Sequence, residues 1–119
     1  MKVLIADDDR TIRALLRDVL ADMGHEVVAA ENGAEAVELC GTARPDIVIL
    51  DFLMPKLSGL DALKRMRERG YAQPVVLLTA ISDSSVREIA GAERPDAILE
   101  KPFKRKTIEK AIAKAAGRE

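Results

Sequence analysis

Acidic side chains follow two apolar runs of this sequence. Residues 3–6 lead into Asp7 and Asp8, and residues 47–50 lead directly into Asp51. Three carboxylates brought close together repel one another unless a cation lies among them. Hard oxygen ligands of this kind suit Mg²⁺, which usually keeps several waters and takes one or two carboxylates.

Two further apolar runs end next to groups that can hold a phosphate. The run 74–79 ends in Thr79, and the run 97–100 is followed by Lys101. A lysine supplies a positive point charge and a threonine supplies a hydroxyl, and both can bind phosphoryl oxygens. A carboxylate, a divalent ion, a lysine and a hydroxyl together indicate phosphoryl transfer to an aspartate.

These side chains meet only if the runs before them are parallel strands of one sheet. Residues 47–50 are four branched apolar residues between two acids, which is typical of a strand buried on both faces. In a parallel sheet all carboxyl ends lie at one edge, about 4.8 Å apart from strand to strand. Ligands bind in the crevice at that edge. Asp51 alone would be read as a strand-capping residue, but the other three strand ends favour a site.

Helical patterns alternate with these strands. Residues 10–23 carry an amphipathic stripe, with Asp9 placed as N-cap and Gly24 as the residue that ends the helix. The remaining patterns predict helices over 33–41, 58–70, 83–90 and 104–116, and strands over 3–6, 26–30, 47–50, 74–79 and 97–100. Five strands alternating with five helices predict an α/β fold, a doubly wound (βα)5 sandwich with a parallel sheet and helices on both faces.

Composition limits the class of protein. The chain has 119 residues, enough for one domain over 1–119, and its net charge of -1 argues against a nucleic-acid binder. A single cysteine excludes an internal disulfide and fits a reducing compartment. The longest uncharged run, 70–82, is far too short to span a membrane, and the N-terminus is no signal peptide. We therefore expect a cytoplasmic domain without membrane insertion.

Four motifs, in this order and spacing, resemble a known family. They are residues 3–8 (VLIADD), Asp51 followed by 54–55 (MP) and Gly59, 79–80 (TA), and 101–103 (KPF). Over essentially its whole length the sequence resembles the response regulator receiver domain of two-component signalling, of the chemotaxis-regulator kind. The resemblance implies a flavodoxin-like fold with strand order 2-1-3-4-5.

The resemblance also implies roles for the reacting groups. Asp51 would take a phosphoryl group from a phosphohistidine of a sensor histidine kinase or a histidine phosphotransfer protein. Lys101 would pair with the phosphoryl oxygens, and Thr79 would move to hydrogen-bond one of them. In such domains the Lys101–Pro102 bond is typically cis.

A metal site is the other implication of the resemblance. Asp7, Asp8 and Asp51, with the backbone carbonyl of Leu53, would hold Mg²⁺ or Mn²⁺. The protein would be a signalling phosphoacceptor rather than an enzyme acting on another substrate, catalysing its own phosphorylation and slow self-dephosphorylation. We expect it to act alone, without an attached output domain, by docking a downstream protein or relaying phosphate.

Three features depart from the family pattern. Ile98 takes the place of the usual aromatic residue three positions before Lys101, so switching must act through Ile98 packing or by another route. The lead into the last strand, 94–97 (RPDA), is altered, which predicts a short fourth helix with an irregular exit on the family's signalling face (helix four, strand five, helix five). Leu53 and Ile81 are apolar where an attacking water would pass, which predicts slow self-dephosphorylation.

Single features of the sequence distinguish this function from its alternatives. An aspartyl-phosphate hydrolase of the haloacid-dehalogenase kind needs a second aspartate where Leu53 stands. A nucleotide-binding fold would need a glycine-rich loop after the first strand, and this sequence has none there. A receiver-like interaction module working without phosphorylation remains the alternative, supported only by Ile98.

Three side chains outside the motifs are expected to be structural. Cys40 is predicted to pack in the core. His25 is predicted to lie at the surface, away from the acids. Arg13 is predicted to face solvent.

Overall fold

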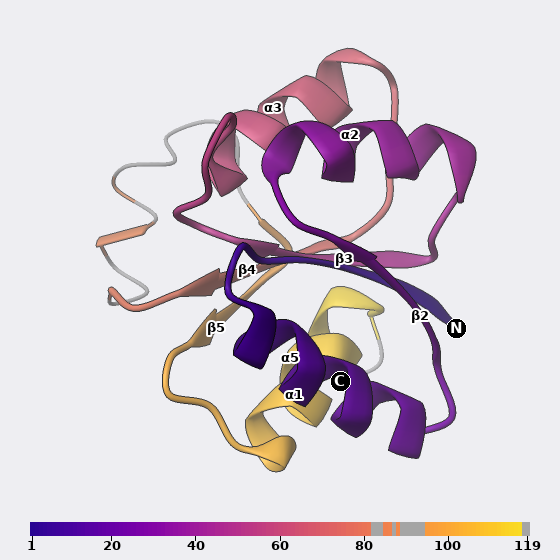
Figure 1. Ribbon diagram of the computed structural model, residues 1–119, viewed down its shortest axis with the longest axis vertical. Helices are drawn as coiled ribbons and strands as arrows, with labels where there is room; N and C mark the ends of the chain where they lie inside the picture. The colour runs from indigo at the N-terminus through magenta and orange to yellow at the C-terminus, as the bar shows by residue number, and fades with distance from the viewer. Residues whose placement is uncertain (82–84, 87, 89–94, 118–119) are drawn as a thin grey trace.

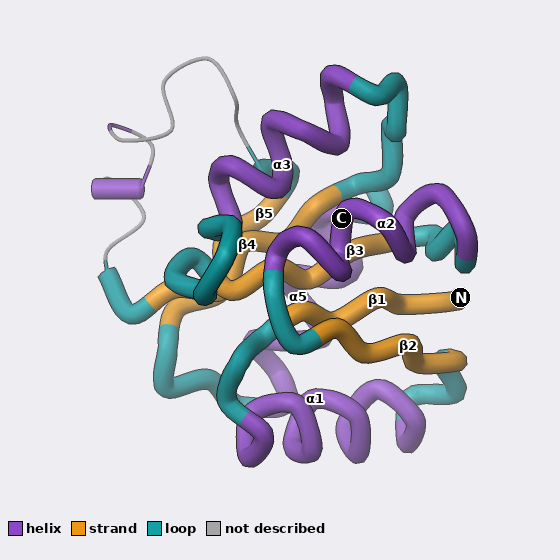
Figure 2. Tube along the Cα trace, turned by 45° about the horizontal axis from the view of Figure 1, so that its top comes forward, coloured by secondary structure: helices purple, strands orange, loops and turns teal. Residues whose placement is uncertain are grey.

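Five parallel strands form a single sheet at the centre of the fold. The computed structural model describes residues 1–81, 85, 86, 88 and 95–117, to which all structural statements refer. The strands are β1 (Lys2–Ala6), β2 (Glu26–Ala30), β3 (Ile47–Asp51), β4 (Val75–Thr79) and β5 (Ala97–Glu100). Their order is β2-β1-β3-β4-β5, and Figure 2 shows β1 between β2 and β3. The expected strand order is confirmed.

Helices cover both faces of this sheet. The described helices are α1 (Arg10–Asp22), α2 (Gly33–Thr42), α3 (Gly59–Glu68) and α5 (Arg105–Ala115). In Figure 1, α2 and α3 lie on one side of the sheet, and α1 and α5 lie on the other. The predicted helix over 83–90 and its exit fall largely outside the described residues.

The apolar side chains of the strands pack into two separate cores, one on each face of the sheet. In β3, Ile47 and Ile49 point into the core beneath α1 and α5, whereas Val48 and Leu50 point into the core beneath α2 and α3. All of β3 and β4 is buried. Because successive side chains of a strand point to opposite faces, a strand covered on both faces must be continuously apolar.

Helix ends follow the predicted signals. The Asp9 carboxylate accepts hydrogen bonds from the backbone N–H groups of Thr11 and Ile12, at the start of α1. Gly24 has a φ of 88° just after the helix, a conformation that glycine adopts without strain. No helix in the described parts of the chain combines the length and the apolarity that crossing a bilayer requires.

Candidate functional site

Three carboxylates converge where β1 and β3 end. The strands are in parallel register with Ala6 opposite Leu50, so Asp7 and Asp51, one residue further along, follow at neighbouring positions. Asp7, Asp8 and Asp51 each offer a carboxylate oxygen within 4.8 Å of the others. The structure therefore brings together the acids that the sequence places at strand ends.

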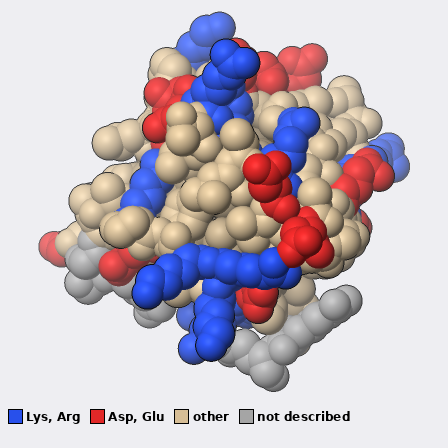
Figure 3. All heavy atoms as spheres, turned by 60° about the horizontal axis from the view of Figure 1, so that its bottom comes forward, with Lys and Arg blue, Asp and Glu red and all other residues tan. Residues whose placement is uncertain are grey.

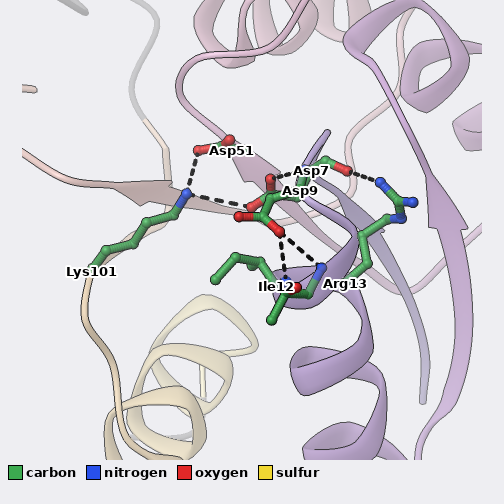
Figure 4. A network of polar contacts seen from close by, with 7 residues as sticks. Asp7, Asp9, Ile12, Arg13, Asp51 and Lys101 are labelled. Carbon is green, nitrogen blue, oxygen red and sulfur yellow. Dashed lines mark hydrogen bonds and ion pairs between the residues drawn. The ribbon is translucent and has the colours of Figure 1, made fainter.

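Lys101 reaches this cluster from the end of β5. Its Nζ donates a hydrogen bond to Asp51 Oδ1 at 3.2 Å and lies 3.5 Å from Asp7 Oδ2 (Figure 4). The bond between Lys101 and Pro102 is cis, as the resemblance implies. One ammonium group thus pairs with two buried carboxylates.

The three consecutive acids after β1, residues 7–9, lie in different environments. Asp9 caps α1, and its backbone N–H donates to Asp7 Oδ1 at 2.9 Å. Asp7 is completely buried, and its Oδ2 has no hydrogen-bond partner among the described residues. Asp8 is exposed at the mouth of the cluster. A buried carboxylate oxygen that accepts no hydrogen bond and has only the Lys101 ammonium beside it, at 3.5 Å, next to two further carboxylates, fits a hard divalent cation such as Mg²⁺.

Thr79 and Leu53 lie at the same edge of the sheet without a described side-chain contact to Asp51. The buried Thr79 hydroxyl accepts a hydrogen bond from the Ile81 N–H at 3.0 Å, and the Thr79 carbonyl accepts one from the Lys101 N–H at 2.7 Å. Leu53 is 74% exposed. Their roles toward a phosphoryl group and a metal stay predictions.

Burial and charge shift the titration of the central pair. The pKa of the Asp51 carboxyl is raised from 3.8 to about 6, chiefly by burial and then by the Asp7 carboxylate, while Lys101 lowers it in part. Burial lowers the pKa of Lys101, but the carboxylates of Asp51 and Asp7 outweigh this effect, so its pKa lies above the ordinary value. Lys101 alone therefore compensates the ionised Asp51 only in part.

Asp51→Asn is expected to stabilise the metal-free domain. Because the folded-state pKa of Asp51 lies above its unfolded value, ionisation costs folding free energy as pH rises through the interval from 3.8 to about 6. The variant should gain about 1–2 kcal/mol at pH near 7.5, and this part of its advantage should vanish near pH 4. Urea unfolding in EDTA at both pH values measures the difference.

Asp18→Asn is the matched control for this prediction, because Asp18 is an exposed acid of α1. Its effect should stay within about 0.5 kcal/mol at both pH values. If Asp51→Asn unfolded more easily than wild type at pH near 7.5, the ion pair with Lys101 would stabilise the fold by more than burial of the Asp51 charge destabilises it. With Mg²⁺ present, wild type should regain stability by ligand binding.

Cys40 lies in the core and His25 lies away from the acids, as the sequence predicts. Cys40 is 1% exposed, and burial raises the pKa of its thiol to about 11, as expected for a core residue. His25 is partly exposed, with Nδ1 3.2 Å from the N-terminal amine, at the opposite edge of the sheet from the acids. Ile98 packs, partly buried, against the core beneath α2 and α3.

The prediction that Arg13 faces solvent is wrong. Its Nη1 donates to the backbone carbonyl of Asp7 at 2.7 Å, and its side chain is only 17% exposed. The available signal was its position in the first turn of the helix that follows the acidic loop, where a long side chain can fold back onto that loop. The sequence pattern alone scores such a residue as polar and external.

Known proteins share this fold and are similar to this sequence. The sequence matches the response regulator receiver domain family over residues 3–113. It is 40% identical over 104 residues to response regulator MprA of Mycobacterium sp. (strain KMS), covering 87% of this chain and 45% of that protein. The chain thus spans less than half the length of the curated relatives it matches.

Solved structures agree. The Francisella response regulator 1452 receiver domain superposes with a TM-score of 0.87 at 28% identity, over 99% of this chain and 98% of that one. Vibrio cholerae chemotaxis protein CheY4 gives 0.83 at 31% identity, over 96% and 97%.

A doubly wound sheet with an acidic cluster and a lysine at its carboxyl edge defines a domain of the chemotaxis-regulator kind. The chain belongs to the response regulator receiver domain family of two-component signalling.

Proposed function

We propose that Asp51 is a phosphoacceptor and that the domain catalyses its own Mg²⁺-dependent phosphorylation. The observation that carries this proposal is the pairing of Lys101 with both Asp51 and Asp7 inside the cluster of three carboxylates. Asp7, Asp8 and Asp51, with the Leu53 carbonyl, would hold Mg²⁺ or Mn²⁺, which when bound neutralises charge on the phosphoryl oxygens.

In the proposed reaction an Asp51 oxygen attacks the phosphorus of a phosphohistidine. The new P–O bond forms as the P–N bond breaks, and the electron pair stays on the imidazole nitrogen of the donor. The Lys101 ammonium pairs with a phosphoryl oxygen and so offsets the repulsion between that oxygen and the Asp51 carboxylate. Thr79 moves away from the Ile81 N–H, and its hydroxyl donates a hydrogen bond to a second phosphoryl oxygen.

The proposed partners are proteins. A sensor histidine kinase or a histidine phosphotransfer protein would donate the phosphoryl group, and a downstream protein would dock on the face of β5 and α5. On the face shown in Figure 3, acidic side chains lie among the lysines and arginines, and the whole chain has a net charge of -1. That balance supports a protein partner over direct contact with nucleic acid.

Incubation with Mg²⁺ and acetyl phosphate, followed by intact mass, tests the proposal. We expect one phosphoryl adduct, lost in Asp51→Asn and when EDTA removes the metal. An adduct that persists in Asp51→Asn would place the phosphoryl group on another residue. No adduct in wild type, with Mg²⁺ binding still measurable, would favour the interaction module that works without phosphorylation.

Slow self-dephosphorylation is a second expectation for this site. Leu53 and Ile81 are 74% and 36% exposed, and neither apolar side chain can orient an attacking water. Replacing Leu53 by asparagine should speed loss of the adduct by roughly tenfold, because a polar group there can position water. Mass spectra taken over time after removal of the donor measure the rate. A wild-type half-life of seconds would contradict this account.

A further inference from the structure

Arg13 holds the backbone of the acidic loop from the side opposite to Lys101. Its Nη1 donates to the Asp7 carbonyl at 2.7 Å, and Figure 4 shows Arg13 and Lys101 approaching Asp7 from opposite directions. Arg13 Nη2 also lies 3.7 Å from Glu31 Oε1, just after β2. One guanidinium thus joins α1 to the ends of β1 and β2.

The contact fixes the peptide between Asp7 and Asp8. The Asp7 N–H donates to the Ala30 carbonyl at 3.3 Å, and Asp7 Oδ1 accepts from the Asp9 N–H at 2.9 Å. The Arg13 bond adds a third restraint, on the carbonyl that leads into Asp8. With these groups held, the remaining Asp7 oxygen, Oδ2, stays buried and free of hydrogen bonds among the described residues.

The charge of Arg13 by itself would act against a metal. A guanidinium near three carboxylates repels a divalent cation, although the neighbouring Glu31 offsets part of that repulsion. If Arg13 acted only through its field, removing it would tighten Mg²⁺ binding. If it acts by orienting the peptide, removing it weakens Mg²⁺ binding. The two accounts therefore predict effects of opposite sign.

We propose that Arg13 is a positioning residue for the metal site, acting through the Asp7 carbonyl to set the relative placement of the Asp7 and Asp8 carboxylates. The proposal rests on the proposed function, because it assumes that this cluster binds Mg²⁺. It adds that Arg13, which is not itself a metal ligand, contributes to the affinity of the site for Mg²⁺. Groups that orient metal ligands typically contribute ten- to hundredfold to affinity.

Titration with Mg²⁺, followed by ¹H–¹⁵N spectra, tests the proposal on the metal alone. Arg13→Met keeps the aliphatic stem and removes the donors. Arg17→Met removes the same charge from an exposed position one turn further along α1. We expect Arg13→Met to weaken Mg²⁺ binding roughly tenfold and Arg17→Met to change it by less than about twofold. Arg13→Lys, which keeps a donor and the charge, should recover part of the loss.

Each outcome decides between accounts. Equal or tighter Mg²⁺ binding by Arg13→Met than by Arg17→Met would overturn the positioning role. The same spectra show whether each variant is folded, and Arg13→Gln, whose shorter amide cannot replace the guanidinium contact, gives the same comparison if Arg13→Met does not fold. Wild type that shows no Mg²⁺-dependent shifts would overturn the metal site itself, whereas normal wild-type binding with an unchanged Arg13→Met would overturn only the role of Arg13.

Discussion

Lys101→Met is expected to slow phosphorylation of Asp51 by about a hundredfold while leaving Mg²⁺ binding intact or tighter. Its ammonium lies 3.2 Å from Asp51 and 3.5 Å from Asp7, so it would compete with a cation for both carboxylates. During transfer the same ammonium would hold a phosphoryl oxygen, which methionine cannot do. Initial rates of adduct formation from acetyl phosphate at saturating Mg²⁺ measure the first effect, and a Mg²⁺ titration measures the second.

Lys106→Met is the control, because Lys106 is an exposed cation in the first turn of α5. It should phosphorylate at the wild-type rate within about twofold. If Lys101→Met lost Mg²⁺ binding together with phosphorylation, Lys101 would be needed to keep the carboxylates in place, and its role would be structural. A Lys101→Met protein that phosphorylates normally would remove Lys101 from the reaction.

The backbone of the site could be predicted because parallel topology dictates it. Alternation of strand and helix patterns places every strand's carboxyl end at one edge, so Asp7, Asp51 and Lys101 had to lie along that edge. The buried runs before Asp51 and Thr79 were recognisable because the part of a strand that helices cover on both faces is apolar on both faces. Strand order, in contrast, came from the family resemblance, since alternation alone fits several orders.

Side-chain contacts within the site could not be predicted in the same way. Arg13 has a long, flexible side chain, and its bond to the Asp7 carbonyl depends on where α1 lies relative to the loop. The Thr79 hydroxyl takes a local bond from the Ile81 N–H, which no pattern of residue types specifies. Contacts such as these depend on distances of a few tenths of an ångström, whereas periodicity describes only faces and edges.

Gly59 is the residue whose size most directly protects the position of Asp51. A Cβ at Gly59 would lie 2.2 Å from the Asp51 carbonyl oxygen and 3.1 Å from Leu77 Cδ1. The Gly59 N–H also donates to the Phe52 carbonyl at 3.0 Å, which holds the start of α3 against the end of β3. The glycine in the motif that follows Asp51 is thus explained by close contact between backbones.

Gly59→Ala should therefore cost about 3 kcal/mol of stability and also displace Asp51. The obstructing atom belongs to the backbone of a fully buried strand, so it cannot yield as a side chain would. Gly70→Ala is the control: Gly70 has a φ of 79° and open space around it, so alanine there should cost only about 1 kcal/mol and leave phosphorylation unchanged. Urea unfolding and adduct formation under conditions where both variants are folded measure the two effects. Full phosphorylation of Gly59→Ala would mean that α3 moves away as a unit while Asp51 keeps its place.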